Sequence, residues 1–423
     1  MRFKIPFVLL ILLSLLAACG SNGSDDNNGD QVVLDIFNIK VETTEQLDNL
    51  IDIYESENEN IKINVTTVGG GQDAASALQA KFSSNEEPSI FLLGGLSDVE
   101  KYQDYLLDVS DMESAIQAID GTLNGVSIDD TPYGIPLNIE GYGWMINKDI
   151  FERAGVEPDS IDSYETFVEA VEVIDSQKEE LGIDAVFGFS GMEDWVVSQF
   201  SSHFTSPEFD HDEAVGYESD ELNFEYGDRM KEYTDLVNQY NIQPILSLDY
   251  STSVEELFTN ERVAMVHQGN WIVPSLNSMD ESFAEEKLSI LPLFVESDEE
   301  GKIIAGPSWY WGINGEKDEE EVEEAKKFLD WMYTSETGKE LITEDFQYIP
   351  AHEGYDTDMI TDPTSAEIYE MVLDEQVGMW ANNQYPDGFF SVALFPEFQK
   401  YLDGQKNWEE FEETISQSFT EMR

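Results

Sequence analysis

The feature that most constrains the fold is an alternation of strand patterns and helix patterns near the start of the chain. Short apolar runs typical of buried strands cover residues 32–37, 61–68 and 89–93. Apolar residues at helical spacing separate these runs, at 47–54 and 73–82. Strands that alternate with helices predict a mostly parallel sheet covered by helices, which places the chain in the α/β class.

The length of the chain predicts two lobes. At 423 residues it exceeds what one hydrophobic core usually serves, and apolar residues make up 41% of it, enough to bury real cores. Cys19 is the single cysteine, so no disulfide can form within the chain. The folded part must therefore be held together by its cores alone.

The charge of the chain is strongly negative. Acidic residues outnumber basic ones by 89 to 21, and the formal net charge is −68. Such a surface repels nucleic-acid phosphates and anionic headgroups, which argues against nucleic-acid binding and against an anionic ligand. Because the excess is larger than solubility requires, our hypothesis is a halophilic or salt-exposed host, in which counterions screen the self-repulsion.

The N-terminus has the parts of a secretion signal: a positive start, an apolar run over 5–16 that is short for a membrane span, and small residues after it. Leu16-Ala17-Ala18-Cys19 resembles the bacterial lipobox, in which the cysteine is lipidated and begins the mature protein. The resemblance implies a signal peptide at 1–18, a lipid anchor at Cys19 and a flexible tether over 19–30. The alternative is an ordinary secretion signal with a chance cysteine.

Five segments carry further motifs, in order along the chain. The first runs from Tyr133-Gly134-Ile135-Pro136 through Glu140 to Ala154-Gly155, and the others cover 260–271, 306–339, 346–351 and 401–410. Together they resemble family 1 extracellular solute-binding proteins, the group that includes maltose- and raffinose-type binding proteins. Ser163-Tyr164 stands where that family often has Thr-Trp, but the departure keeps an aromatic residue.

The resemblance implies a two-lobed, periplasmic-binding-protein-like fold with a ligand cleft between the lobes. Because the family's chain crosses between lobes more than once, we expect lobe I at 31–140 and 301–343, and lobe II at 141–300 and 344–423. The implied protein is anchored on the extracellular face of the cell membrane, where it binds a carbohydrate, closes around it and delivers it to the permease subunits of an ABC importer. The family is usually monomeric, and we expect no cofactor.

Several residues are candidates for the ligand cleft, because aromatic rings stack on the apolar face of a sugar and planar polar groups bind its hydroxyls. Trp309 and Trp311 flank Tyr310, so strand geometry places both on one face, either core or cleft. Family resemblance gives Trp271, after Asn270, a stacking role and Glu140 a sugar-contacting role. The remaining candidates follow predicted strands or flank Glu140: Asn38, Lys40, Asp98, Tyr142, Trp195 and Trp380.

Two other readings remain open. A surface glycosidase would need two placed carboxylates, and with 89 acidic residues a plausible pair proves nothing. The motifs of zinc proteases, serine hydrolases and P-loop proteins are missing, and the four histidines have no metal spacing, so we expect neither an enzyme nor a metal site. An adhesin or sensor lipoprotein fits the lipobox equally well.

Overall fold

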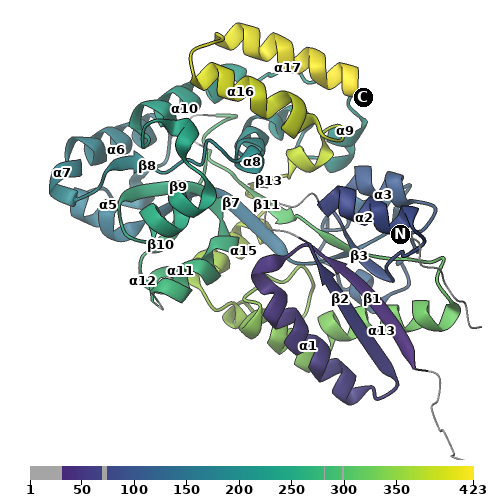
Figure 1. Ribbon diagram of the computed structural model, residues 1–423. Helices are drawn as coiled ribbons and strands as arrows, with labels where there is room; N and C mark the ends of the chain where they lie inside the picture. Colours follow the sequence, from purple (N-terminus) through teal and green to yellow (C-terminus); the bar gives the residue numbers. More distant parts are fainter. Residues whose placement is uncertain (1–30, 69–73, 281, 298–299) are drawn as a thin grey trace, which may run out of the picture.

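The computed structural model describes residues 31–68, 74–280, 282–297 and 300–423. The predicted signal peptide at 1–18, the lipid anchor at Cys19 and the tether that follows it lie outside the described residues. Figure 1 shows two α/β bodies, each built on its own sheet, with strand β7 (Ile139–Asn147) at the junction between them. The predicted two-lobed α/β fold is confirmed.

The first sheet has the strand order β2-β1-β3-β12-β6. β1 is parallel to β2 and to β3, as the alternation near the start of the chain predicts. β12 and β6 complete the sheet in the antiparallel direction. The strands are β1 (Val32–Asn38), β2 (Ile61–Thr67), β3 (Ile90–Leu93), β6 (Ile135–Pro136) and β12 (Tyr310–Ile313).

Helices cover both faces of the first sheet. α1 (Thr44–Glu57) and α13 (Glu319–Thr334) pack on one face, and α2 (Ala74–Ser83) and α3 (Leu96–Tyr102) pack on the other. The buried residues of α1 are those whose helical spacing predicted it: Leu47, Leu50, Ile51 and Tyr54. Pleating sends Tyr310 into the α3 face and Trp311 into the α1 face, because successive strand residues point to opposite sides.

The second sheet is mixed, with the strand order β13-β11-β7-β9-β8 and with β10 also paired to β7. Alternate residues of β7 enter two different cores, Trp144 on the face of α6, α8, α10, α16 and α17, and Met145 on the face of α11 and α15. The other strands are β8 (Ala185–Phe187), β9 (Val263–Gly269), β10 (Leu288–Leu291), β11 (Ile303–Pro307) and β13 (Val377–Gly378). The helices are α6 (Tyr164–Ser176), α8 (Asp194–Thr205), α10 (Gly227–Tyr240), α11 (Val273–Met279), α15 (Pro363–Leu373), α16 (Phe395–Leu402) and α17 (Trp408–Met422).

The last helix, α17, begins at a reciprocal cap formed by Asn407 and Glu410. The Asn407 side chain accepts a hydrogen bond from the backbone N of Glu410 at 3.0 Å, and the Glu410 carboxylate accepts one from the backbone N of Asn407 at 3.1 Å. This reciprocal cap satisfies two donors that a helix start leaves without intrahelical partners. α17 therefore starts at Trp408, and its buried side chains join the core of the second lobe.

The chain crosses between the sheets more than once. It passes from β6 to β7 at residues 138–139 and returns from β11 to β12 at 307–308, since β11 pairs with β7 and β12 pairs with β3. Phe346, Tyr348 and Tyr355 then pack in the core of the first sheet. The expected boundary at 301 lies before β11, which stays paired with β7 up to residue 307, and the expected boundary at 344 lies before Phe346 and Tyr348.

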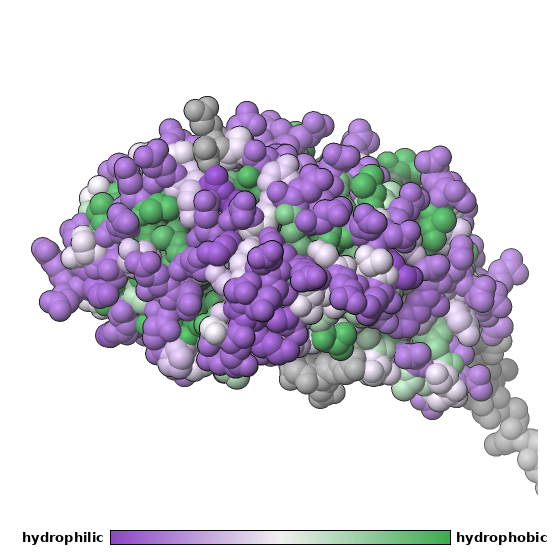
Figure 2. Space-filling view, turned by 90° about the horizontal axis from the view of Figure 1, so that it is seen from above, coloured by the Kyte–Doolittle hydropathy of each residue, from purple (hydrophilic) through white to green (hydrophobic). Residues whose placement is uncertain are grey.

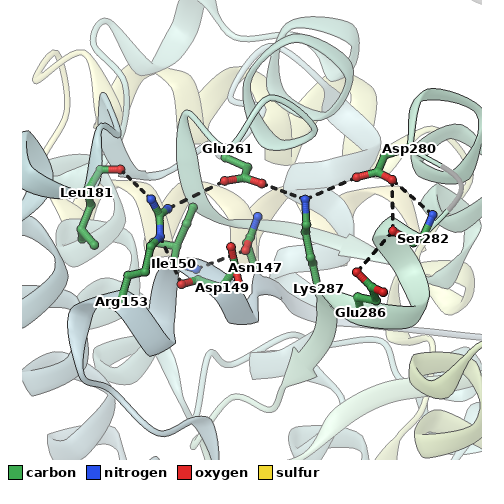
Figure 3. Close-up of polar contacts among 10 residues, drawn as sticks. All are labelled: Asn147, Asp149, Ile150, Arg153, Leu181, Glu261, Asp280, Ser282, Glu286 and Lys287. Atoms are coloured by element: carbon green, nitrogen blue, oxygen red, sulfur yellow. Dashed lines mark hydrogen bonds and ion pairs between the residues drawn. The ribbon is translucent and has the colours of Figure 1, made fainter.

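Ion pairs occupy the end of the second sheet that lies away from the first. Lys287, just before β10, contacts Glu261 Oε1 at 2.9 Å and Asp280 Oδ2 at 3.3 Å, and Arg153 of α5 (Lys148–Ala154) lies 3.8 Å from Glu261 (Figure 3). Asn147 caps α5 by accepting a hydrogen bond from the backbone N of Ile150 at 3.2 Å. The two cations Lys287 and Arg153 thus partly neutralise the carboxylates of Glu261 and Asp280, which would otherwise repel one another.

The surface is predominantly hydrophilic. Figure 2 shows hydrophilic side chains over most of the face seen from above, with hydrophobic ones in small separate patches. Within the described ranges, no helix is long and apolar enough to cross a membrane. Across the same ranges, His, Cys, Asp and Glu side chains do not gather in groups of three or more that could hold a metal ion.

Candidate functional site

Strand pairing brings the candidate residues of the first sheet to one edge. β1, β2 and β3 are parallel, so Asn38, Thr67 and Gly94, which end or follow them, share that edge. The Asn38 Nδ2 donates to Thr67 Oγ1 at 3.2 Å across it. Because β12 is antiparallel and starts opposite the end of β3, Trp309 lies at the same edge.

The second sheet presents a matching edge toward the first. β7 starts there with Glu140, and β9 ends there because Gly269 pairs with Tyr142 near the start of β7. β8 is parallel to β9 and β13 is parallel to β11. The segments that follow β8 and β13 therefore return to this edge, and they carry Trp195 and Trp380. The sequence-predicted residues of both lobes, apart from Trp311, thus come together near the junction.

An aromatic row lines the edge of the second sheet, with Trp271 at its centre. The Trp271 ring centroid lies 6.4 Å from Trp195, 6.2 Å from Trp380 and 6.0 Å from Tyr142. Trp271 Nε1 donates to Gln268 Oε1 at 2.9 Å, which fixes the orientation of the indole. Trp195 and Trp271 are half-buried, whereas Trp380 is buried. The row therefore consists of one buried indole, Trp380, and two indoles, Trp195 and Trp271, that keep exposed surface.

Tyr142, His203 and His267 form a neutral cluster behind this row. The Tyr142 ring centroid lies 5.3 Å from His203 and 5.7 Å from His267, and Tyr142 is fully buried. Burial lowers the pKa of His267 to about 3, lowers that of His203 well below its ordinary value, and raises that of Tyr142. All three are therefore uncharged at neutral pH, and Tyr142 supports the row from within the lobe.

A cavity of about 550 Å³ lies between α3 and the segment that follows Trp380. That volume is in the range of small-molecule sites. Asp98 lines the cavity, and its Oδ2 accepts a hydrogen bond from the backbone N of Gly94 at 2.8 Å. Burial raises the pKa of Asp98, while the Gly94 N–H and Lys101 oppose that rise. A Cβ added at Gly94 would meet the Trp309 ring at 3.3 Å, so the Trp309 indole lies directly against this glycine, beside Asp98.

A buried polar triad joins the two crossovers. Lys40 Nζ lies 2.5 Å from Glu140 Oε1, and Ser308 Oγ donates to Glu140 Oε2 at 2.5 Å. Lys40 and Glu140 are 9% and 4% exposed, so both oxygens of Glu140 are engaged within the protein. The Lys40–Glu140 pair therefore belongs to the packed structure of the hinge, which we define as the two crossovers at 138–139 and 307–308.

Three other candidates, Trp311, Asn270 and Asn38, also form hydrogen bonds to other residues of the protein. Trp311 is 2% exposed in the core of the first lobe, where its Nε1 donates to the Tyr333 hydroxyl at 2.9 Å. Trp309 packs against the same core as Trp311, in keeping with the expected shared face, but it lies just before β12, which starts at Tyr310, and it is only half-buried. Asn270 Oδ1 accepts from the backbone N of Gly141 at 3.0 Å, and Asn38 Oδ1 accepts from that of Lys40 at 3.1 Å.

Several cavity residues were not among the sequence candidates: Lys101, Asn382, Asn383 and Asp387. Lys101 is one helical turn after Asp98, and the other three stand around a Pro-Asp-Gly turn at 386–388. Pro, Asp and Gly are turn-forming residues, so the sequence alone indicates only a turn there. Since loops beyond strand ends carry ligand contacts in α/β proteins, the position of this segment after β13 was the signal that could have identified it.

Relatives support this two-lobed arrangement. A multiple sugar-binding protein from Streptococcus mutans serotype c is 22% identical over 284 residues, which is 64% of each chain, so the matched region spans less than two thirds of that relative. A chitin oligosaccharide binding protein has a similar structure, with a TM-score of 0.74 and 21% identity over 93% of this chain and 99% of that one. The solute-binding protein RafE in complex with raffinose gives a TM-score of 0.75 and 17% identity over 92% and 99%.

The match to a protein family covers most of the chain. Residues 49–367 match the family described as bacterial extracellular solute-binding protein. The matched segment includes both crossovers, the aromatic residues Trp195, Trp271 and Trp309, and the triad residue Glu140. The chain belongs to the family of bacterial extracellular solute-binding proteins.

Proposed function

We propose that this chain is the substrate-binding component of an ABC importer and that it captures a neutral di- or oligosaccharide between the facing edges of its two sheets. The observation that carries the proposal is the pairing of the half-exposed indoles Trp195 and Trp271 on one edge with Trp309 and Asp98 on the other. Indoles give flat apolar surfaces for pyranose rings, and Asp98 is an acceptor for hydroxyl hydrogen bonds.

The order of the indoles favours a ligand with more than one ring. Trp195 and Trp271, the two indoles of the row that keep exposed surface, have ring centroids 6.4 Å apart and an interplanar angle of 66°, so one pyranose does not stack on both. Three relatives whose names specify a sugar ligand support the same substrate class: a multiple sugar-binding protein, a chitin oligosaccharide binding protein and a raffinose complex.

Charge narrows the ligand further. The described residues that line the cavity include two carboxylates, Asp98 and Asp387, and one cation, Lys101. The chain as a whole carries a net charge of −68. The cavity carboxylates and the negative charge of the whole chain would both repel a uronate or a sugar phosphate. We therefore expect neutral saccharides to bind and acidic saccharides not to bind.

The membrane attachment, the division into lobes and the monomeric state are parts of the same proposal. Secretion through residues 1–18 and lipidation at Cys19 would place the folded part outside the membrane, where the closed form delivers its ligand to the permease subunits. Lobe I consists of the residues around the first sheet, up to 138 and from 308 to about 355, and lobe II comprises the rest. The chain binds and releases its ligand without catalysis.

A thermal-shift screen tests the proposal, since a ligand stabilises the state that it binds. Raffinose, chitin oligosaccharides, neutral disaccharides, monosaccharides, a uronate, a polyamine and a peptide are compared at saturating concentrations. We expect shifts with neutral oligosaccharides and none with the uronate. Trp271→Ala should abolish the shift, whereas Trp331→Ala, which truncates a half-buried tryptophan that packs on Tyr54 far from the junction, should keep it. A shift with the peptide or polyamine alone would overturn the substrate class, and release of hydrolysed product would overturn the binding role.

A further inference from the structure

A short helix of the second lobe contacts the first lobe beside the cavity. α9 (Glu213–Glu218) packs against α3 and against the turn η2 (Asn124–Val126) (Figure 1). The Tyr217 hydroxyl donates to Glu100 Oε2 at 2.5 Å. Glu100 is on α3, between Asp98 and Lys101, both of which line the cavity. The hydrogen bond therefore joins the two lobes at the rim of the candidate site.

The second lobe holds Tyr217 in place from behind. The Arg423 guanidinium lies 5.7 Å from the Tyr217 ring centroid, and its Nη2 donates to the backbone O of Gly216 at 2.9 Å. A Cβ at Gly216 would lie 2.9 Å from the Met379 side chain, so the helix is packed closely on its own lobe. Because α9 is fixed to the second lobe in this way, it moves with that lobe when the lobes separate.

The start of the same helix also faces the first lobe. Glu213 is half-buried, its pKa is raised to about 7 by burial, and its charge acts on Tyr310 of β12. Both ends of α9 thus approach elements of the first lobe, Glu213 toward Tyr310 and Tyr217 toward Glu100. The contact is an extended one, in which the Tyr217–Glu100 hydrogen bond is the directional part.

We propose that α9 is an inter-lobe latch, in which the Tyr217–Glu100 hydrogen bond stabilises the closed form without touching the ligand. An interaction made in only one of two conformations shifts their populations by its own free energy. Opening the lobes separates Tyr217 from Glu100, so the bond contributes to the closed form alone. The role in ligand affinity rests on the proposed function, whereas the effect on lobe position is independent of any ligand.

A ligand-free distance measurement tests the latch. In the Cys19→Ser chain the only native cysteine is removed, so spin labels attach only at Ser83→Cys on α2 and Gln417→Cys on α17, one on each lobe. We expect Tyr217→Phe to lower the ratio of short to long distances roughly threefold to tenfold, as for loss of one hydrogen bond to a charged group that is partly exposed. Tyr401→Phe is the matched control, because Tyr401 donates to Asp235 Oδ1 at the same 2.5 Å within the second lobe.

Affinity for raffinose, measured by calorimetry, is the second readout. Tyr217→Phe and Glu100→Ala should each weaken binding by a similar factor, and the double variant should be no weaker than the stronger single one, because both remove the same bond. Distances and affinity equal to those of Tyr401→Phe, or tighter binding by Tyr217→Phe, would overturn the latch. If raffinose and the other saccharides fail to bind any variant while the distances still differ, the proposed function fails and the latch stands.

Discussion

Lys40 Nζ lies 2.5 Å from Glu140 Oε1, and this ion pair links the end of β1 to the first crossover between the lobes. Ser308, at the second crossover, donates to the other oxygen of the same carboxylate. One carboxylate therefore connects three segments that are distant in sequence. Two charges that are this buried are costly unless each has its partner, so the pair constrains the hinge.

Removing one member of this pair should destabilise the protein strongly. We expect Lys40→Met to lower the free energy of unfolding by about 3–5 kcal/mol, because it leaves the Glu140 carboxylate buried without its counter-charge. The double change Lys40→Met with Glu140→Gln should recover part of this loss. Urea denaturation at neutral pH provides the measurement.

An exposed lysine gives the control for the hinge pair. Lys62 lies 2.9 Å from Glu55, but its side chain is 49% exposed, so Lys62→Met should change the free energy of unfolding by less than about 1 kcal/mol. Equal effects of the two lysine changes would show that the Lys40–Glu140 pair carries no special weight in the hinge.

Gly269 is required for the position of Trp271. A Cβ at residue 269 would lie 2.3 Å from the Trp271 ring and 2.4 Å from the backbone O of Gly141, closer than atoms can approach. We expect Gly269→Ala to displace the indole and to abolish the thermal shift with neutral oligosaccharides. In Gly315→Ala the new Cβ would meet Leu107 at an ordinary 3.5 Å, so this variant should bind as the unchanged chain does. Binding by Gly269→Ala at full affinity would remove Trp271 from the site.

Much of the fold could be predicted from local patterns. The parallel order of β1, β2 and β3 follows from strand runs separated by helical spacing, and the start of α17 follows from its cap at Asn407. The hinge was harder to place. β7 is buried along its whole length, so its sequence has no alternation of polar and apolar residues that would mark where the second sheet begins.

Within the candidate site, too, some positions could be predicted from neighbouring residues, whereas others depend on partners that are distant in the sequence. The position of Trp271 at the junction could be predicted because it follows a strand whose end is visible in the sequence. The direction of Glu140 could not, since its partners Lys40 and Ser308 lie 100 and 168 residues away along the chain. Trp309 and Trp311 pack against the same core, as their spacing predicts, but Trp309 keeps exposed surface because it lies at the edge of the sheet, just before β12.

Acid should destabilise the protein through His267. Its pKa is about 3 in the folded protein and about 6.5 when unfolded, so between these values the unfolded chain binds one proton more than the folded chain. Stability from this residue is complete above pH 6.5 and falls by about 1.4 kcal/mol per pH unit below it. Buried carboxyls with raised pKa values, such as Asp98 and Glu213, act in the opposite direction over part of this range.

A variant isolates the histidine from those carboxyls. His267→Phe keeps an aromatic ring among Tyr142, Trp144 and Phe200 but cannot be protonated. Compared by urea denaturation at pH 7 and pH 5, the stability of the unchanged chain should fall relative to the variant by about 2 kcal/mol. Parallel pH profiles of the two chains would mean that His267 does not titrate on unfolding.

Salt should stabilise the folded protein. With 89 acidic and 21 basic residues, most carboxylates lack a basic partner even where networks such as Glu261–Lys287–Asp280 use their cations twice (Figure 3). Repulsion among the remaining carboxylates extends over about 10 Å at 0.1 M salt and about 3 Å at 1 M. We expect the melting temperature to rise by several degrees between 0.1 and 1 M NaCl, with a smaller rise in sucrose, which strengthens burial without screening charge. A melting temperature that is the same at both salt concentrations would contradict the salt-exposed origin that the composition suggests.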